Sequence, residues 1–240
     1  MMAHLPPQEP DFGPWKVESV QTFVQSLRNA LPEDARRPAV VAIDGRSASG
    51  KTTLAALLRA AVAGSAVVHT DDIAWHHSFF GWAELLMGAV LEPVRAGLGV
   101  AFRPSAWEAR GREGAITVPP GCTVVILEGV GAARRELMPA LDAVVWAQSD
   151  LDRARSRGIA RDGGSAEAAA FWDEWMAEEL PFLADQRPWE RANFVVCGTP
   201  ALEHDPASQV VVPAQDTQKS SRPIAQNPPR SSMKRKTSFS

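Results

Sequence analysis

The chain has 240 residues, of which 45% are hydrophobic and 22% charged, and its net charge is −3 at pH 7. This composition is typical of one soluble domain with or without a tail, and it excludes fibrous, collagen-like and wholly disordered chains. No apolar stretch approaches the roughly 20 residues of a membrane span, and the amino terminus lacks the apolar core of a secretion signal. We therefore expect a cytoplasmic protein with no membrane partner.

The C-terminal end differs from the rest in charge and composition. Residues 205–240 carry six Lys or Arg and two Asp, a net charge of +4 that leaves −7 for the remainder. From residue 204 the sequence is rich in Pro, Ser, Gln and Lys without sustained periodicity, which predicts a disordered basic tail over residues 204–240. The Lys-Arg-Lys cluster at residues 234–236 is typical of a solvated tail, so we expect no specific nucleic-acid partner.

Ahead of the tail, short apolar runs alternate with helical patterns, which predicts the α/β class. One helix is expected at about residues 17–30, within an N-terminal segment of residues 1–37. The apolar runs are near-continuous, as in strands buried on both faces of a parallel sheet. They predict strands at residues 39–43, 66–69, 123–127, 143–147 and 193–197, and the longer patterns predict helices at residues 51–63, 82–96, 150–161 and 166–186.

The first predicted strand leads into a segment, residues 45–52, that fits G-x-x-x-x-G-K-S/T at every fixed position. Its glycines permit a tight turn whose backbone N–H groups point inward around phosphates, and the following helix adds its own unpaired amides. The pattern predicts that Lys51 lies between the β- and γ-phosphates of ATP and that the Thr52 hydroxyl binds Mg²⁺. The predicted nucleotide-binding residues here are Gly45, Arg46, Ser47, Ala48, Ser49, Gly50, Lys51, Thr52 and Thr53.

Acidic residues follow the next two predicted strands. Asp71 and Asp72 follow the second strand, and Glu128 ends the third. Because the carboxyl ends of parallel strands form the ligand crevice, we expect these residues near the γ-phosphate. The chain has neither the Asn-Lys-x-Asp signature of GTPases nor the Leu-Ser-Gly-Gly-Gln signature of transporter ATPases. The arrangement therefore favours a kinase.

The two carboxylates after the second strand predict the catalytic base. Asp71 is the first candidate to take the proton of an acceptor hydroxyl, and Asp72 is the second. Neighbours on a strand point to opposite faces, so only one of the two can face the acceptor. An Asx turn that merely ends the strand is the alternative. Glu128 ends a buried strand, where an unpaired charge is costly, so we expect it to bind Mg²⁺, its water shell or a hydrogen-bonding partner.

Three arginines follow the fourth predicted strand with helical spacing. Arg153, Arg157 and Arg161 stand four residues apart and share one helix face. Guanidinium groups in such a row suit the charge that spreads over phosphoryl oxygens during transfer. We expect a lid in which Arg153 and Arg157 bind ATP and Arg157 also assists catalysis, with a plain solvated helix face as the alternative. In the last predicted helix, the aromatic residues Phe171, Trp172 and Trp175 are interpreted as core.

Some 50 residues separate the second and third predicted strands, a long insertion of a kind that is usually functional. The insertion is rich in aromatic residues and arginines, which could stack a base or bind an anionic acceptor. For any single aromatic residue, a place in the core is the favoured alternative. The candidate acceptor-binding residues are His76, Trp82, Arg103, Trp107 and Arg110.

Four segments resemble the uridine kinase-like group of phosphate-loop kinases, which also includes pantothenate kinase and phosphoribulokinase. They are IDGRSASGKTTLA (43–55), HTDD (69–72), VVILEGV (124–130) and DLDRARSRGIARD (150–162), within a resemblance that spans about residues 38–200. It implies a five-stranded parallel core flanked by helices, ATP as donor, an acceptor hydroxyl deprotonated by the second-strand aspartate, and an arginine-rich lid. The group commonly has Asp-x-Phe-Tyr where this chain has Asp-Asp-Ile-Ala-Trp at residues 71–75, so the acceptor pocket is differently furnished.

We therefore predict a kinase domain over residues 38–203 that uses ATP and Mg²⁺ to phosphorylate a hydroxyl of a nucleoside or similar small metabolite. The catalytic candidates are Lys51, Asp71, Asp72 and Arg157. One alternative is a nucleoside monophosphate kinase, in which Arg103, Arg110 and Arg112 would bind the acceptor's phosphate. Another is a non-catalytic ATP-binding sensor. The oligomeric state stays open.

Overall fold

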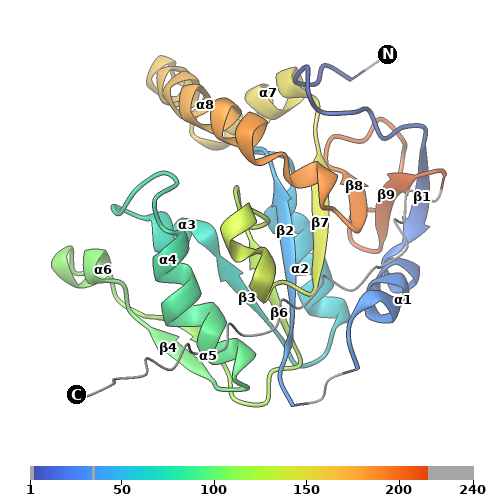
Figure 1. The fold of residues 1–240 in the computed structure, drawn as a ribbon. Helices are drawn as coiled ribbons and strands as arrows, with labels where there is room; N and C mark the ends of the chain where they lie inside the picture. Colours follow the sequence, from blue (N-terminus) through green and yellow to red (C-terminus); the bar gives the residue numbers. More distant parts are fainter. Residues whose placement is uncertain (1–2, 34–35, 216–240) are drawn as a thin grey trace, which may run out of the picture.

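The central sheet of the computed structural model, which describes residues 3–33 and 36–215, has five parallel strands (Figure 1). Their order across the sheet is β3-β6-β2-β7-β8. The middle strand is enclosed on both faces, with Val40, Val41 and Ile43 all 0% exposed, which explains the continuous apolar runs. The predicted α/β class and parallel sheet are confirmed. The strands are β2 (Ala39–Gly45), β3 (Ser65–His69), β6 (Val124–Glu128), β7 (Ala143–Gln148) and β8 (Phe194–Cys197).

One face of the sheet is covered by helices α1 (Val20–Ala30) and α2 (Lys51–Ala61). The early helix begins three residues later than the pattern indicates. Ser19 precedes it in an extended conformation and accepts a hydrogen bond from Thr22 N at 3.1 Å, so it forms the N-cap. The other helix on this face, α2, directly follows the loop after β2, and its buried residues pack on the sheet.

The insertion between β3 and β6 covers the opposite face. The helix predicted over residues 82–96 is divided into α4 (Ala83–Leu86), a π-helical turn (Met87–Leu91) and α5 (Glu92–Arg95). Pro93 is the second residue of α5, directly after the π-helical turn, and it has no backbone N–H to donate to this continuous helical run. The remaining elements of this insertion are α3 (Thr70–Ala74), β4 (Val100–Phe102), α6 (Ser105–Ala109) and β5 (Ile116–Val118).

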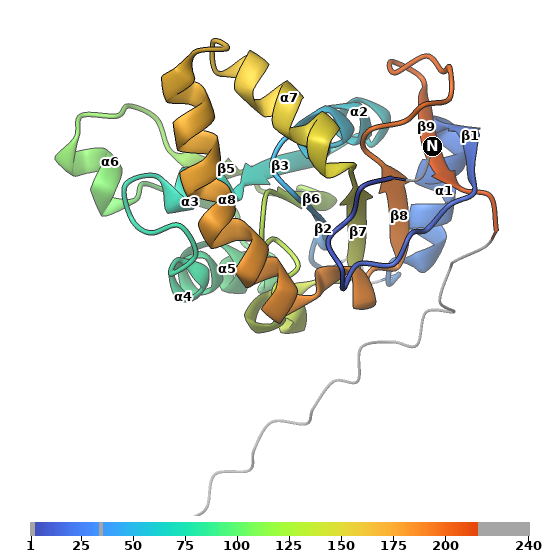
Figure 2. The same ribbon diagram turned by 90° about the horizontal axis from the view of Figure 1, so that it is seen from above.

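Helices α7 (Leu151–Arg161) and α8 (Ala166–Gln186) form a hairpin at the carboxyl end of the sheet (Figure 2). The two helices approach closely at Gly158, where an added Cβ would lie 1.9 Å from the ring of Trp172. Short 3-10 turns at Arg135–Ala140 and Pro188–Glu190 follow β6 and α8. None of the helices in the described parts of the chain has the length and apolar character needed to cross a bilayer.

The first part of the predicted disordered tail is instead a strand. Strand β9 (Gln209–Pro213) pairs in antiparallel fashion with β1 (Trp15–Ser19). Val210, Val211 and Val212 are buried, because the short apolar run at this point packs beside α1 and β8. The prediction of disorder from residue 204 is therefore wrong for residues 204–215, and residues 216–240 lie outside the described part of the chain.

Candidate active site

The loop between β2 and α2 has the backbone geometry of a phosphate-binding nest. At Gly45 an added Cβ would lie 2.6 Å from Ala147 O, so no side chain fits there. Ala48 and Gly50 have positive φ values of 57° and 86°, which turn successive N–H groups toward one side. Residues Ser47–Thr53 line a cavity of about 1030 Å³. The predicted loop therefore lies at the wall of a cavity large enough for a nucleotide and a second small molecule.

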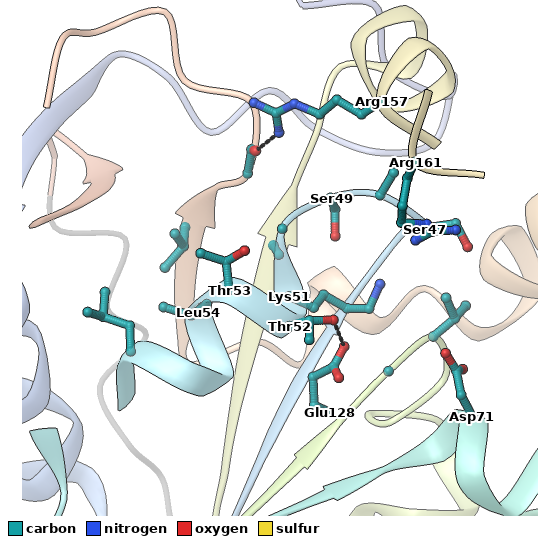
Figure 3. A pocket seen from close by; sticks show the side chains of 18 of the residues that line it. Ser47, Ser49, Lys51, Thr52, Thr53, Leu54, Asp71, Glu128, Arg157 and Arg161 are labelled. Carbon is teal, nitrogen blue, oxygen red and sulfur yellow. Dashed lines mark hydrogen bonds between the residues drawn. The ribbon is translucent and has the colours of Figure 1, made fainter. Parts of the chain in front are cut away.

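The Thr52 hydroxyl and the Glu128 carboxylate lie side by side at the wall of this cavity. Thr52 Oγ1 donates to Glu128 Oε1 at 3.3 Å (Figure 3). On the other carboxylate oxygen, His69 Nδ1 lies 2.7 Å from Glu128 Oε2, and this hydrogen bond raises the pKa of His69. A hydroxyl and a carboxylate side by side are oxygen donors of the kind that Mg²⁺ prefers, so these residues fit a bound Mg²⁺. His69 was not predicted as part of the site.

Asp71 and Asp72 occupy the first turn of α3 rather than the end of β3. Asp71 lines the cavity, and its carboxylate points toward the space into which Lys51 extends (Figure 3). Burial raises the pKa of Asp71, while the nearby Lys51 ammonium opposes that rise. Asp72 instead forms an ion pair with Arg112, and Trp107 Nε1 donates to its backbone oxygen at 2.9 Å. Of the two aspartates only Asp71 lines the cavity, and the reason is helical rotation rather than the strand alternation on which the prediction rested.

The three predicted arginines of α7 do not all reach the cavity. Arg157 and Arg161 line the cavity. Arg157 Nη1 donates to Gly198 O at 2.6 Å, and Arg161 pairs with the neighbouring Asp162 at 2.8 Å. Arg153 does not line the cavity, because its guanidinium donates to Thr199 O at 3.1 Å. The structure therefore does not bring Arg153 to the cavity together with Arg157 and Arg161.

Two loop residues are held from outside the cavity by buried glutamates. The Arg46 side chain is 1% exposed and forms an ion pair with Glu9, so the predicted nucleotide contact of Arg46 rests on its backbone. Ser47 N and Ser47 Oγ donate to the Glu179 carboxylate of α8 at 3.0 and 2.6 Å. Trp175 Nε1 donates to the same carboxylate at 2.5 Å. Neither glutamate was predicted from the sequence.

The acceptor candidates separate into core and surface residues. Trp82 and Trp107 are 1% and 3% exposed and belong to the apolar core, so they are wrong as acceptor contacts. Arg103 and Arg110 do not line the cavity either, and Arg103 instead donates to Arg112 O at 2.8 Å. Of the predicted set, His76 alone lines the cavity. The aromatic residues that do line it are Trp75, Phe79, Phe171, Trp172 and Trp175.

The aromatic residues of α8 are only partly core. Trp172 is buried, as interpreted, but Phe171 is 55% exposed and Trp175 lies at the cavity wall. Trp175 makes an edge contact with Phe79, with ring centroids 4.9 Å apart. This contact joins α8 to the insertion between β3 and β6, so both contribute to one aromatic wall near Asp71.

A second end of the cavity is formed by the segment that follows β8. Gly198, Pro200 and Pro206 line it together with Gln209 and Val210 of β9. Thr53 and the apolar side chains of Leu54 and Leu57 from α2 line the same cavity. Sequence reasoning missed Pro206, Gln209 and Val210 because it assigned residues from 204 onward to a disordered tail.

No family model and no curated protein matches the chain. Among the solved structures that are similar to it are two whose titles name a kinase. A protein titled "putative fructose transport system kinase", from Silicibacter sp., is 21% identical, with a TM-score of 0.48 over 72% of this chain and 94% of that one. A "possible uridine kinase" from Bacillus stearothermophilus is 23% identical, with a TM-score of 0.46 over 73% of this chain and 96% of that one. The kinase activities in these titles are those of the two similar proteins.

Proposed function

We propose that the protein is an ATP- and Mg²⁺-dependent kinase that phosphorylates a hydroxyl of a neutral, ring-bearing metabolite, such as a nucleoside. The observation that carries the proposal is that Lys51, the Thr52–Glu128 pair and Asp71 line one cavity around the phosphate loop. These groups supply a cation, a pair of oxygen donors and a base at one point. Charge stabilisation by the cations and proton removal by the base both accelerate phosphoryl transfer to a hydroxyl.

On the donor side, the loop amides and Lys51 hold the phosphates of ATP, and Arg157 and Arg161 approach from the lid. Thr52 and Glu128 would hold Mg²⁺, which when bound neutralises charge on the phosphates. We assign the adenine base to the apolar lining residues Leu57 and Pro206. The γ-phosphoryl group then points toward Asp71.

On the acceptor side, Asp71 takes the proton of the attacking hydroxyl. The acceptor oxygen forms a bond to the γ-phosphorus as the bond to the β-phosphate oxygen breaks, and ADP leaves with its new negative charge near Lys51. Trp75, Phe79 and Trp175 offer ring faces and edges to a planar group. This wall supports an acceptor that carries a ring.

The distribution of cations supports a neutral acceptor over a nucleoside monophosphate. Among the described residues that line the cavity, the Lys and Arg side chains are Lys51, Arg157 and Arg161, which the proposal assigns to the donor phosphates. Arg112, one of the arginines considered for an acceptor phosphate, is paired with Asp72 and stacks on Trp107 at 3.6 Å. An acceptor phosphate would therefore have no partner of its own.

The test is transfer of label from ATP carrying a labelled γ-phosphate, in the presence of Mg²⁺, to separate panels of nucleosides, neutral sugars and nucleoside monophosphates. We expect labelled product from a neutral acceptor and none with the Lys51→Ala variant. Product from monophosphates alone would establish the first alternative. MgATP binding without transfer to any panel would favour a nucleotide sensor.

A further inference from the structure

A buried ion pair joins the amino-terminal segment to the phosphate loop. The Glu9 side chain is 0% exposed and its Oε2 accepts from Arg46 Nη1, whose side chain is 1% exposed. The other oxygen, Oε1, accepts from Trp146 Nε1 and Gln148 Nε2 at 2.8 Å each. Arg46 also donates to Ser149 O. Three donors on β7 and the loop therefore converge on one carboxylate that comes from outside the sheet.

The segment that carries Glu9 is fastened on both sides of this residue. His4 N donates to Asp150 Oδ2 at 2.8 Å, and Leu151 N donates to His4 O at 2.9 Å, at the start of α7. Farther along, Phe12 N donates to Gln148 Oε1 at 3.2 Å. Residues 4–12 thus form a strap that runs from the base of α7 past the loop to the end of β7 (Figure 2).

Arg46 connects this strap to the group that faces the nucleotide. Its side chain points away from the cavity to Glu9, while its backbone oxygen accepts a hydrogen bond from Lys51 Nζ at 2.8 Å. The position of the Arg46 backbone therefore determines where the Lys51 ammonium rests. A displacement of about 1 Å in a preorganised site costs on the order of 10²-fold in function, so this support matters even though it lies outside the cavity.

We propose that Glu9 is a positioning residue for nucleotide binding, which acts through Arg46 to hold the phosphate loop and Lys51 in their binding geometry. This inference rests on the proposed nucleotide site. It assigns to the amino-terminal strap a role in ligand affinity, beyond its packing on the sheet. Breaking a buried ion pair leaves the remaining charge uncompensated, so Arg46 and its backbone would shift once Glu9 is replaced.

The experiment measures the Kd of MgATP by titration calorimetry, with melting temperature as a second readout. Glu9→Gln offers one carbonyl oxygen and an NH₂ to three donors, so we expect the Kd to rise at least about tenfold. Arg46→Gln should weaken binding similarly. The Glu9→Gln/Arg46→Gln double variant should bind no more weakly than either single variant, because both changes act through the same contact.

Two controls separate positioning from loss of stability. His4→Ala removes a strap contact near α7 without touching Arg46, and Val212→Ala trims the β1–β9 pair outside the cavity wall. Both should bind MgATP like the wild type, even where Val212→Ala lowers the melting temperature as much as Glu9→Gln does. If Glu9→Gln does not fold, Arg46→Lys keeps the charge but cannot reach both Glu9 and Ser149, and it should still raise the Kd.

Three outcomes would overturn the inference. They are a wild-type Kd in folded Glu9→Gln or in Arg46→Lys, additive effects in the double variant, or an equal loss of affinity in Val212→Ala. Failure of the proposed function looks different. The wild-type protein would then bind no MgATP, or would bind it without transferring the γ-phosphoryl group to any acceptor, and neither result depends on a change at Glu9.

Discussion

Arg112 holds Asp72 in an ion pair on the α6 side of α3, which leaves the adjacent Asp71 as the aspartate that lines the cavity. Arg112 also stacks on Trp107, whose indole N–H donates to the Asp72 backbone. One arginine and one tryptophan therefore fix the orientation of the whole first turn. The two neighbouring carboxylates therefore have different surroundings, since Asp72 is paired with Arg112 and Asp71 lines the cavity.

Replacing Lys51 with Ala should lower turnover at least about a hundredfold, because it removes the cation from the phosphate site. Lys51 is 7% exposed and its Nζ is bonded to Arg46 O, so a modest drop in melting temperature accompanies the loss. Steady-state kinetics measure the effect. Lys16→Ala removes a partly exposed lysine from β1 and serves as the matched control, which should retain full turnover.

Truncation at residue 204 should destabilise the protein, because it removes β9 with its three buried valines. Burial of each valine contributes about 1.5–3 kcal/mol, so we expect the melting temperature to fall by about 10 °C or more. The truncated chain should also lose MgATP affinity, since Pro206 and Gln209 line the cavity. The control is a chain that ends at residue 215, which keeps every contact described for β9. Equal melting temperatures for the two chains would contradict the role of this strand.

Glu128→Gln should raise the Mg²⁺ concentration needed for half-maximal activity by about 10- to 100-fold, because an amide is a weaker ligand than a carboxylate. Titrating Mg²⁺ at saturating ATP gives this concentration directly. Glu108→Gln, an exposed change on α6, is the control and should not alter it. An unchanged Mg²⁺ requirement in Glu128→Gln would remove Glu128 from the metal site.

The pH dependence of kcat/KM should have an acidic limb set by Asp71. Burial raises the pKa of this carboxyl above the usual aspartate range, and a base works only when deprotonated. Activity is therefore complete above the raised pKa and falls as the pH drops through it. The measurement is kcat/KM across the acidic range in a buffer series of constant ionic strength. A flat acidic profile, with the protein folded throughout, would argue against Asp71 as the base.

The sheet and the loop could be predicted because their signals are local. Strand β2 is a continuous apolar run and residues 45–52 are a contiguous motif, so neither needs knowledge of a distant partner. Glu9 and Glu179 could not be predicted, because their partners in the loop stand 37 and 132 residues away in the chain. Their burial depends on those contacts, and charge patterning alone places a glutamate on the surface.

The errors in the acceptor site and the tail have the same cause. Trp82 and Trp107 carry no local sign of whether they face the core or a ligand, and the fold places both in the core. Strand β9 is a five-residue run within polar sequence, and its partner β1 lies near the other end of the chain. Long-range pairing of this kind leaves no periodic pattern for sequence reasoning to detect.

The measurement that tests the proposed chemistry most directly is single-turnover phosphoryl transfer by Asp71→Asn and Asp72→Asn, alongside MgATP affinity. Asparagine keeps the size of the side chain but cannot take the proton, so Asp71→Asn should slow transfer by about 10² to 10⁴ with little change in affinity. Asp72→Asn keeps an oxygen for Arg112 and should slow it far less. Transfer at the wild-type rate in Asp71→Asn, or a larger loss in Asp72→Asn, would contradict the assignment of Asp71 as the catalytic base.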